Sequence, residues 1–264
     1  MKKCFNHIYG PLFSWRLGVS LGIDPVCHTG KLCTFDCVYC QIGKTKGLSA
    51  KRKVFVKTRD IMEELRVLPD MNIDYITFSG SGEPTLARNL GEIIKEIRKI
   101  RKEKIAVITN SSLIDRSDVQ KDLALADFVL LKLDAYREEL FIDVNRPLKG
   151  IRFNNIIKGI KRFRAVYKKR LALQIMFTER NKAYVEDIAS LAKTLGIKEV
   201  QLNTPLRQSM ERPLSKYEMD DIRRYFKGMK ISYVYETKKR CVEPISNTAT
   251  QKRHGREFAS SCEM

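Results

Sequence analysis

The sequence lacks two features that would assign the protein to common structural classes. No stretch of its 264 residues approaches the roughly 18 uncharged apolar residues of a membrane span, and no apolar signal-peptide core follows its first residues. Its seven cysteines are an odd number, which a disulfide framework explains poorly in a chain without an export signal. We therefore expect a cytoplasmic protein, with no membrane partner, in which some cysteines bind metal.

Acidic residues are scarce relative to basic ones. The chain has 31 Asp and Glu against 50 Lys and Arg, which gives a formal net charge of +19. Such a charge attracts polyanions, of which nucleic acid is the commonest in the cytoplasm. The basic residues concentrate in segments 44–57, 95–104 and 158–170, and the last two also fit the solvated faces of amphipathic helices. The first follows a cysteine-rich loop, and five of its side chains are expected to line a site entrance and attract RNA phosphates: Lys44, Lys46, Lys51, Arg52 and Lys53.

No repeat or low-complexity linker divides residues 10–236, so we predict one domain over residues 1–236. Residues 237–264 form a basic tail or a small appended element. Short aliphatic runs predict strands at 17–23, 74–79, 104–109, 127–133, 171–178 and 199–204. Helical spacing between the strands places two sets of apolar residues on helix faces: Leu90, Ile93, Ile94, Ile97 and Ile100, and Phe153, Ile156, Ile157, Ile160 and Phe163.

Strands that alternate with helices predict a parallel sheet. Because the strand runs are apolar on both faces, we expect a partial (β/α)6 TIM-like barrel of parallel strands with outer helices. Ligands of such an α/β protein gather at the carboxyl ends of the strands.

Three cysteines lie within eight residues, just after the first predicted strand: Cys33, Cys37 and Cys40. Soft thiolates favour an iron-sulfur cluster or zinc, and a loop this short can wrap a cubane. Three thiolates would leave one of four irons without a protein ligand. A zinc site or a four-cysteine electron-transfer cluster, with Cys27 or His28 as the fourth ligand, is the alternative.

Polar residues follow the next three predicted strands. After the second strand come Gly80, Ser81, Gly82, Glu83 and Pro84. The glycines allow a sharp turn and a close approach to a ligand, although an ordinary loop is the simpler interpretation of this segment alone. Asn110 ends the third strand, and Lys132 and Asp134 end the fourth. Asn110 and Asp134 could instead cap the helices that follow.

The cysteine triplet, Tyr39 just before its last member, and the Gly-Ser-Gly-Glu-Pro strand end together resemble the radical S-adenosylmethionine (SAM) superfamily. This resemblance implies that Cys33, Cys37 and Cys40 bind a 4Fe-4S cluster, that SAM chelates the open iron, and that Tyr39 packs near adenine. It further implies that residues 80–84 bind the SAM amino group. Ribose or carboxylate contacts are the role that it implies for the next strand ends, which carry Asn110, Lys132 and Asp134.

The resemblance also implies a reaction. An electron, from a donor such as ferredoxin or flavodoxin, passes through the cluster to the sulfonium of SAM and produces methionine and a 5'-deoxyadenosyl radical that abstracts hydrogen from a substrate. Arg146 is a candidate for gripping a substrate phosphate or the SAM carboxylate, and a surface salt bridge is its alternative role.

Further motifs at 10–12, 16–24, 41–45, 144–147 and 201–204 are similar to a group of radical SAM proteins classed beside the tRNA wybutosine synthases. We therefore expect an enzyme that modifies RNA, with tRNA as its substrate. Wybutosine synthesis itself is not expected, because archaeal wybutosine synthases carry a further cysteine set near the amino terminus, where this chain has only Cys4 and Cys27.

Three alternatives remain open from the sequence. A radical SAM enzyme could act on a protein or a small metabolite, with the basic charge reflecting only a solvated surface. A nucleic-acid-binding protein could carry a structural cluster or zinc without catalysis. A second cluster could be bound by the remaining cysteines, which lack local spacing: Cys4, Cys27, Cys241 and Cys262.

Overall fold

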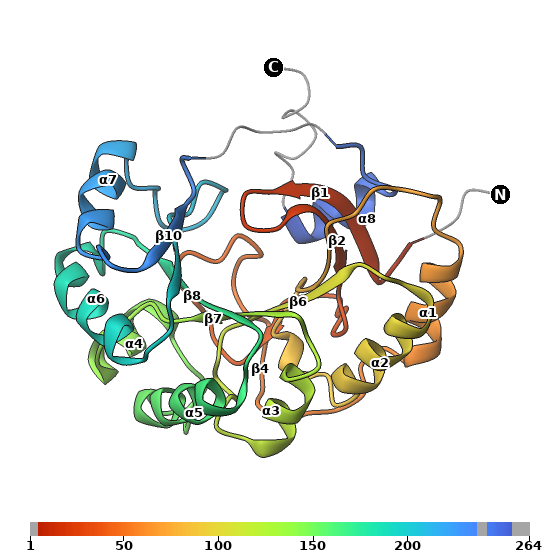
Figure 1. Cartoon of the computed structure of the whole chain (residues 1–264), viewed down its shortest axis with the longest axis horizontal. Helices are drawn as coiled ribbons and strands as arrows, with labels where there is room; N and C mark the ends of the chain where they lie inside the picture. Colours follow the sequence, from red (N-terminus) through yellow and green to blue (C-terminus); the bar gives the residue numbers. More distant parts are fainter. Residues whose placement is uncertain (1–4, 237–241, 255–264) are drawn as a thin grey trace.

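A curled sheet dominates the computed structural model, which describes residues 5–236 and 242–254 (Figure 1). Within these residues, eight strands pair in the order β1-β2-β5-β6-β7-β8-β9-β10, and every neighbouring pair is parallel except the antiparallel hairpin of β1 and β2. Their bounds are β1 Ile8–Ser14, β2 Gly18–Ile23, β5 Tyr75–Phe78, β6 Lys104–Thr109, β7 Phe128–Lys132, β8 Arg170–Met176, β9 Glu199–Asn203 and β10 Lys230–Tyr233. The short strands β3 Leu32–Cys33 and β4 Gly47–Leu48 pair separately.

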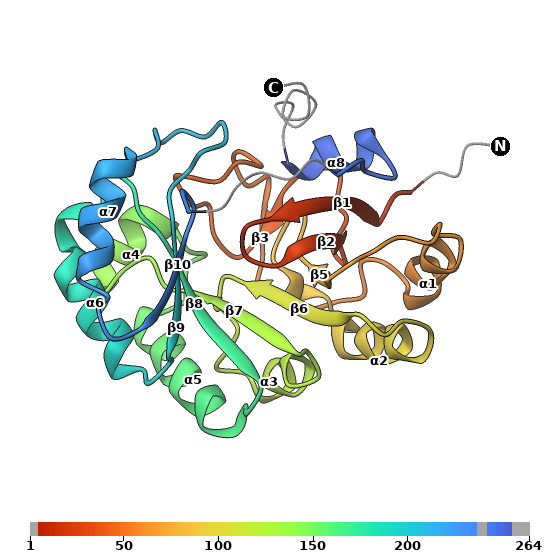
Figure 2. The same cartoon turned by 45° about the horizontal axis from the view of Figure 1, so that its top comes forward.

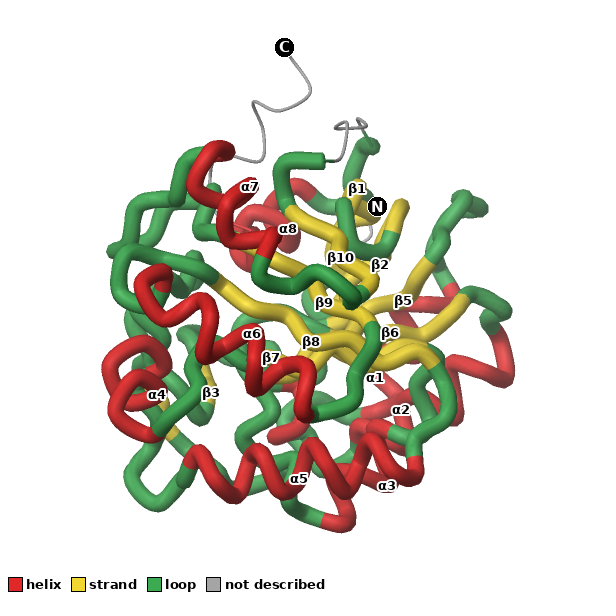
Figure 3. Tube along the Cα trace, turned by 60° about the vertical axis from the view of Figure 1, so that its left-hand side comes forward, coloured by secondary structure: helices red, strands yellow, loops and turns green. Residues whose placement is uncertain are grey.

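Helices cover the outer face of this sheet, as Figures 1 and 3 show. They are α1 Thr58–Arg66, α2 Leu90–Ile100, α3 Ser117–Leu123, α4 Glu138–Asn145, α5 Phe153–Val166, α6 Val185–Thr194 and α7 Lys216–Arg224, with the 3-10 turns η1 Pro84–Leu86 and η2 Lys182–Tyr184. The main hydrophobic core lies between the sheet and these helices. The result confirms the predicted partial barrel of parallel strands with outer helices.

The two edge strands of the sheet were not predicted. All six predicted strands are present within about two residues of their expected bounds, as β2 and β5 to β9. The prediction missed β1 because it contains Gly10 and Pro11 and carries an irregularity in register between Tyr9 and Leu12, features that weaken the strand pattern. It missed β10 because this strand has only four residues, and its first three are at least partly exposed.

The predicted apolar helix faces are largely correct. In α2, the buried residues include Leu90, Ile93, Ile94 and Ile97, which face the core. Ile100 is the exception, with 41% of its surface exposed, because it is the last residue of the helix. In α5, Ile157 is only partly buried.

A short helix from the C-terminal part of the chain, α8 Asn247–His254, lies beside β1 (Figure 2). Ala249 packs against Tyr9 and Leu12, and the Gly10 amide donates to Thr250 Oγ1 at 3.1 Å. This helix belongs to residues 237–264, which were predicted to form a tail or a small appended element. At least this part of the segment packs on the sheet. Among the described helices, none combines the length and the apolar character needed to cross a membrane.

Candidate functional site

The cysteine loop follows β2 at the carboxyl end of the parallel strands, and backbone hydrogen bonds hold it from two sides. On one side, the Ser49 amide donates to the Cys33 carbonyl at 3.1 Å, next to the β3-β4 pair. On the other side, the Asp36 amide donates to Asn145 and Arg146, and the Val38 amide donates to Val144. The conformation of this loop therefore depends on the segment that ends α4.

All three cysteines of the loop act on one ammonium group, that of Lys31. Burial disfavours the charge of Lys31, yet the nearby thiols of Cys40, Cys33 and Cys37 raise its pKa above the usual value. The side chain is almost fully enclosed, donates to the Gly43 carbonyl at 3.3 Å and lies 3.6 Å from Asp36 Oδ1. A buried cation thus faces the predicted ligand set. No pattern in the sequence marks Lys31, although it lies two residues before the first cysteine.

Two amide side chains donate to sulfur in the same loop. Asn110 Nδ2 lies 3.5 Å from Cys33 Sγ, and Asn145 Nδ2 lies 3.5 Å from Cys37 Sγ. Burial, followed by the charge of Glu83, raises the pKa of Cys33 to about 12, and burial likewise raises the pKa of Cys37. Burial therefore disfavours the thiolate form of these two side chains, and the amides and Lys31 would stabilise the thiolates that bind a metal.

The glycine loop after β5 packs directly against the cysteine loop. A side chain at Gly82 would place its Cβ 1.8 Å from the Leu32 carbonyl oxygen, and one at Gly80, where φ is +142°, would meet the Asp24 carboxyl. Asp24 accepts from both the amide and the hydroxyl of Ser81, at 3.0 and 2.7 Å. These close contacts leave no room for a side chain at either glycine. They also hold the loop beside Cys33.

Glu83 connects this loop to the end of β6. Its carboxylate accepts from Thr85, from Thr109 Oγ1 at 2.6 Å and from the Asn110 amide at 2.7 Å. Burial raises its pKa, and these hydrogen bonds oppose the rise. Pro84, the next residue, is buried and begins η1.

The alternative role of Asn110 and Asp134 as helix caps is wrong. Helix α3 is preceded by Arg116 at its N-cap position and α4 by Arg137, and neither helix has a side-chain cap. Asn110 Oδ1 instead accepts from the Ser112 amide at 3.0 Å, and Asn110 Nδ2 donates to Thr34. Its side chain thereby links the end of β6 to the cysteine loop.

Tyr39 is held by a buried polar network. Its hydroxyl donates to Asp134 Oδ2, and Asn145 Nδ2 donates to both of these groups, at 3.0 and 2.8 Å. Burial, reinforced by the carboxylate of Asp134, raises the pKa of Tyr39 well above its usual value. Lys132 Nζ lies 4.7 Å from the centre of the Tyr39 ring and 3.6 Å from Asp134 Oδ1. The structure therefore brings these three predicted residues together.

Asn145 is the residue of this network that sequence reasoning missed. It lies in the motif at 144–147, where the charge of the neighbouring Arg146 makes that residue the more obvious candidate for a ligand contact. The structure buries Asn145 and exposes Arg146, whose backbone adopts a left-handed conformation at the end of α4. The only signal in the sequence for this residue was an amide side chain within a short motif.

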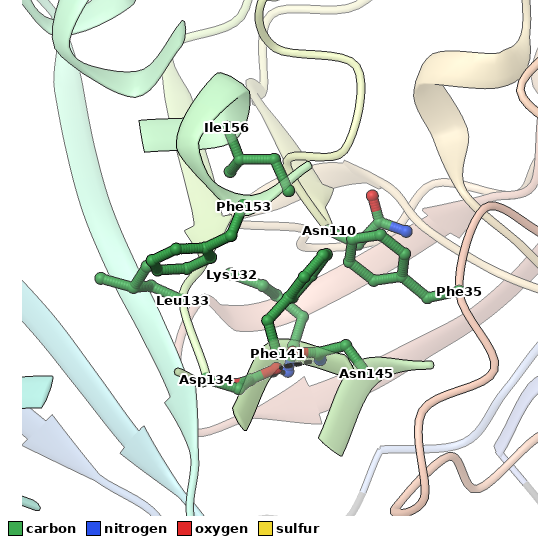
Figure 4. Close-up of a pocket in the computed structure, with 9 residues that line it drawn as sticks. All are labelled: Phe35, Asn110, Lys132, Leu133, Asp134, Phe141, Asn145, Phe153 and Ile156. Carbon is green, nitrogen blue, oxygen red and sulfur yellow. Dashed lines mark hydrogen bonds and ion pairs between the residues drawn. The ribbon is translucent and has the colours of Figure 1, made fainter. Parts of the chain in front are cut away.

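A small cavity lies under the cysteine loop (Figure 4). Its volume of about 10 Å³ suits at most one water molecule, so it is a packing gap and not a chamber for a nucleoside. It is lined by Phe35 from the loop, by Asn110, Lys132 and Asp134 from the strand ends, and by aromatic residues of α4 and α5. Just after β6, the Ser111 hydroxyl is buried and has no hydrogen-bond partner among the described residues.

Two sequence alternatives fit the structure poorly. Among the described residues, no three His, Cys, Asp or Glu side chains converge as a single metal ion would require. Cys27, the suggested fourth ligand, donates to the Asn6 carbonyl and accepts from Arg253, and His28 is exposed and accepts from the Gly30 amide. The other three cysteines proposed for a second cluster lie outside the described residues: Cys4, Cys241 and Cys262.

Arg52 was predicted to line the site entrance, and this prediction is wrong. Its side chain is only 4% exposed and forms ion pairs with Asp118 and Asp122 on α3. It also donates to the carbonyls of Thr85 and Ala87, because it fills the space between the segment after the cysteine loop and η1. The four lysines of the same prediction are exposed: Lys44, Lys46, Lys51 and Lys53.

Comparisons with known proteins agree with this geometry. The model of the radical SAM superfamily matches residues 28–192, which include the cysteine loop and the strand ends β5 to β8. The UPF0026 protein slr1464 of Synechocystis sp. is 41% identical over 213 residues, which are 78% of this chain and 78% of that protein.

Two solved structures share the fold. One, described as TYW1 with a lysine-pyruvate adduct bound, has a TM-score of 0.58 and 19% identity over 80% of this chain and 74% of that one. Another, anSMEcpe with bound AdoMet, has a TM-score of 0.61 and 20% identity over 82% of this chain and 64% of that one. Together with the family match, the fold and the cysteine loop establish that this chain belongs to the radical SAM superfamily of enzymes, a family that implies a 4Fe-4S cluster and SAM.

Proposed function

We propose that this radical SAM enzyme modifies RNA, with tRNA as its substrate, and that Cys33, Cys37 and Cys40 hold its 4Fe-4S cluster. The observation that carries the cluster assignment is that two buried amides, Asn110 and Asn145, donate to Cys33 Sγ and Cys37 Sγ within the loop that contains all three cysteines. The donor set fits a cluster, because three soft thiolates with amide donors to their sulfurs are typical of iron-sulfur sites. The orphaned hydroxyl of Ser111 at the neighbouring strand end supports a further bound group there.

The chain's own residues would prepare this site in three ways. Lys31 would offset the negative charge of the thiolates, and Asn110 and Asn145 would donate to Cys33 and Cys37. The SAM contacts that we propose are those of the family pattern: Tyr39, Gly80, Ser81, Gly82, Glu83, Pro84, Asn110, Lys132 and Asp134. When bound, the cluster and SAM would supply a one-electron cleavage that starts radical chemistry on the substrate.

An RNA substrate is favoured by charge close to the site. Lys44, Lys46 and Lys51 are exposed on the segment that follows the cysteine loop. The Gly47 amide donates to the Lys31 carbonyl at 3.2 Å, and the Ser49 amide donates to Cys33, so this segment is tied to the loop itself. With a net charge of +19 on the whole chain, these lysines would bring a phosphate backbone to the mouth of the half-barrel. Arg146, also exposed, stays a candidate for a phosphate contact.

The cluster assignment is tested by SAM cleavage after anaerobic reconstitution, with dithionite as reductant in place of the ferredoxin or flavodoxin that we expect. Wild-type protein should form 5'-deoxyadenosine. Cys37→Ser should lose both iron and cleavage, whereas the matched control Cys27→Ser should keep them, because Cys27 contacts Arg253 and Asn6. Loss of iron in both variants, or in neither, would refute the assignment.

The RNA assignment is tested by tRNA affinity as a function of salt. Replacing Lys44, Lys46 and Lys51 together by Gln should reduce the magnitude of the slope of log K against log salt by about 2–3, because each of the three phosphate contacts contributes about 0.7–0.9. A control triple of exposed lysines on and after α2 should leave the slope nearly unchanged: Lys95, Lys99 and Lys102. Equal slopes for both triples would argue against an RNA substrate and in favour of a protein or a metabolite.

A further inference from the structure

The concave inner face of the sheet carries a row of polar side chains. On β7, β8 and β9, the residues that belong to the helix-side core alternate with residues that face inward, because successive side chains of a strand point to opposite faces. Deep inside, Leu17, Phe128 and Ala172 form a separate small apolar cluster. Nearer the carboxyl ends, the inward positions are polar, and the strand register aligns three of them in one row: Lys132, Gln174 and Gln201.

Gln201 is the unusual member of this row. It is fully buried, and neither its amide nitrogen nor its amide oxygen has a hydrogen-bond partner among the described residues. An unpaired buried amide costs about 1–3 kcal/mol, so native proteins rarely retain one without a reason. Because Gln201 lies next to Gln174 in the register, its amide faces the same inner space.

A guanidinium group reaches Gln174 from the hairpin turn between β1 and β2. With the Gln174 amide oxygen turned toward Arg16, this oxygen accepts from Arg16 Nε and Nη2 at 2.7 Å each. Burial, reinforced by the positive charge of Arg207, lowers the pKa of Arg16 to about 9, and no described carboxylate opposes this shift. A partly buried cation therefore lies inside the half-barrel, with no acidic counterpart in the part of the chain that the structure describes.

We propose that Arg16, Gln174 and Gln201 form a subsite for an oxyanion of the substrate, a carboxylate or a phosphate group. Because the Nε–Nη2 edge of Arg16 donates to Gln174, the other edge of the planar guanidinium would donate to either group, and the Gln201 amide would supply a further donor. The row continues to Lys132 beside Tyr39, so a substrate anchored at Arg16 would extend toward the cysteine loop. This inference rests on the proposed function, since it assigns the group by which the enzyme holds its substrate.

The chain carries its own reporter for this subsite. Trp15 is the only tryptophan in the sequence, and the Arg16 guanidinium lies 4.4 Å from the centre of its ring. An anion that binds Arg16 would change this contact and hence the tryptophan fluorescence. The experiment titrates the reconstituted full-length protein, before reductant or SAM is added, with sodium phosphate and separately with sodium acetate. Sodium chloride keeps the ionic strength constant.

We expect a saturable fluorescence change in the wild-type protein. Arg16→Gln should weaken the apparent affinity about tenfold or more, because it removes a charged, forked donor. Gln201→Leu should also weaken it, although loss of an unpaired buried amide should not destabilise the fold. Arg59→Gln, which removes an exposed charge on α1, is the matched control and should leave the titration unchanged.

Tighter binding of phosphate would indicate a phosphate-bearing substrate, and tighter binding of acetate would indicate a substrate with a carboxylate. Either result supports the subsite. A response without saturation in both titrations, or an Arg16→Gln titration that equals wild type, would overturn it. The titration involves no SAM cleavage. Failure of SAM cleavage would therefore refute the proposed function without deciding the subsite, and an unresponsive Trp15 would refute the subsite alone.

Discussion

At the scale of single residues, one buried amide connects the cysteine loop to the strand ends. Asn145 Nδ2 lies within hydrogen-bonding distance of Cys37 Sγ, the Tyr39 hydroxyl and Asp134 Oδ2, which belong to the cysteine loop and to the end of β7. Because the backbone of the same segment accepts from the loop amides of Asp36 and Val38, its side chain and main chain act on the loop together. The position of Cys37 therefore depends on Asn145.

We predict that Asn145→Ala lowers the free energy of unfolding by about 1–3 kcal/mol, since it leaves buried acceptors without their donor. Urea denaturation of the cluster-free protein measures this loss. Asn155→Ala changes an exposed residue of α5 and should shift stability by less than about 0.5 kcal/mol. Equal effects of both substitutions would contradict the role that we give to Asn145.

At the scale of elements, α8 contributes a buried ion pair to the glycine loop. Arg253 Nε lies 3.0 Å from Asp24 Oδ2, and both side chains are 1% exposed. The same carboxylate oxygen accepts from Ser81, so α8 supports the segment beside Cys33 through a single intermediate residue. A helix from the end of the described chain thus stabilises a loop near its beginning.

Removing the charge of α8 tests this connection. Arg253→Met should lower the free energy of unfolding by about 3–5 kcal/mol, because it leaves the Asp24 carboxylate buried without its partner. Lys252→Met, at the exposed neighbouring position, should have almost no effect. The double variant Asp24→Asn with Arg253→Met should recover part of the loss. No recovery would indicate that packing of the Arg253 stem matters more than the ion pair.

Helix α7 gives a prediction about pH. Lys182, together with the amide and hydroxyl of Ser215 in a capping box, lowers the pKa of Glu218 to about 2. Because the folded pKa is below the unfolded value, the charged carboxylate stabilises the fold above about pH 4.5, and this contribution is lost as the pH falls toward 2. For this partly exposed group it amounts to about 1 kcal/mol or less. Glu218→Gln should flatten the pH dependence of urea denaturation in this range, and an unchanged curve would contradict the assignment.

Elements with regular periodicity could be predicted, and contacts between distant segments could not. The strands β5 to β9 follow from short aliphatic runs, and the apolar faces of α2 and α5 follow from helical spacing of apolar residues. Arg52 looked like a surface cation because its partners Asp118 and Asp122 lie on α3, some 65 residues or more away. The burial of Arg253 depends on Asp24 and was equally invisible in a basic, polar segment.

At the scale of the whole molecule, the half-barrel has its structural core on one side of the sheet and its candidate functional site at the carboxyl ends of the strands. Helices bury the outer face of the sheet (Figures 1 and 2). The loops at the carboxyl ends of its strands carry the cysteines, the glycines and the polar network. On the inner face of the sheet, apolar side chains lie farther from these loops, and polar side chains lie nearer to them.

The most direct test of the central claim is electron paramagnetic resonance of the reduced, anaerobically reconstituted protein before and after SAM is added. Three cysteines would leave one iron open, so we predict the signal of a single 4Fe-4S cluster whose spectrum changes when SAM binds. A cluster signal that does not respond to SAM, or a protein that binds zinc and no iron, would contradict it.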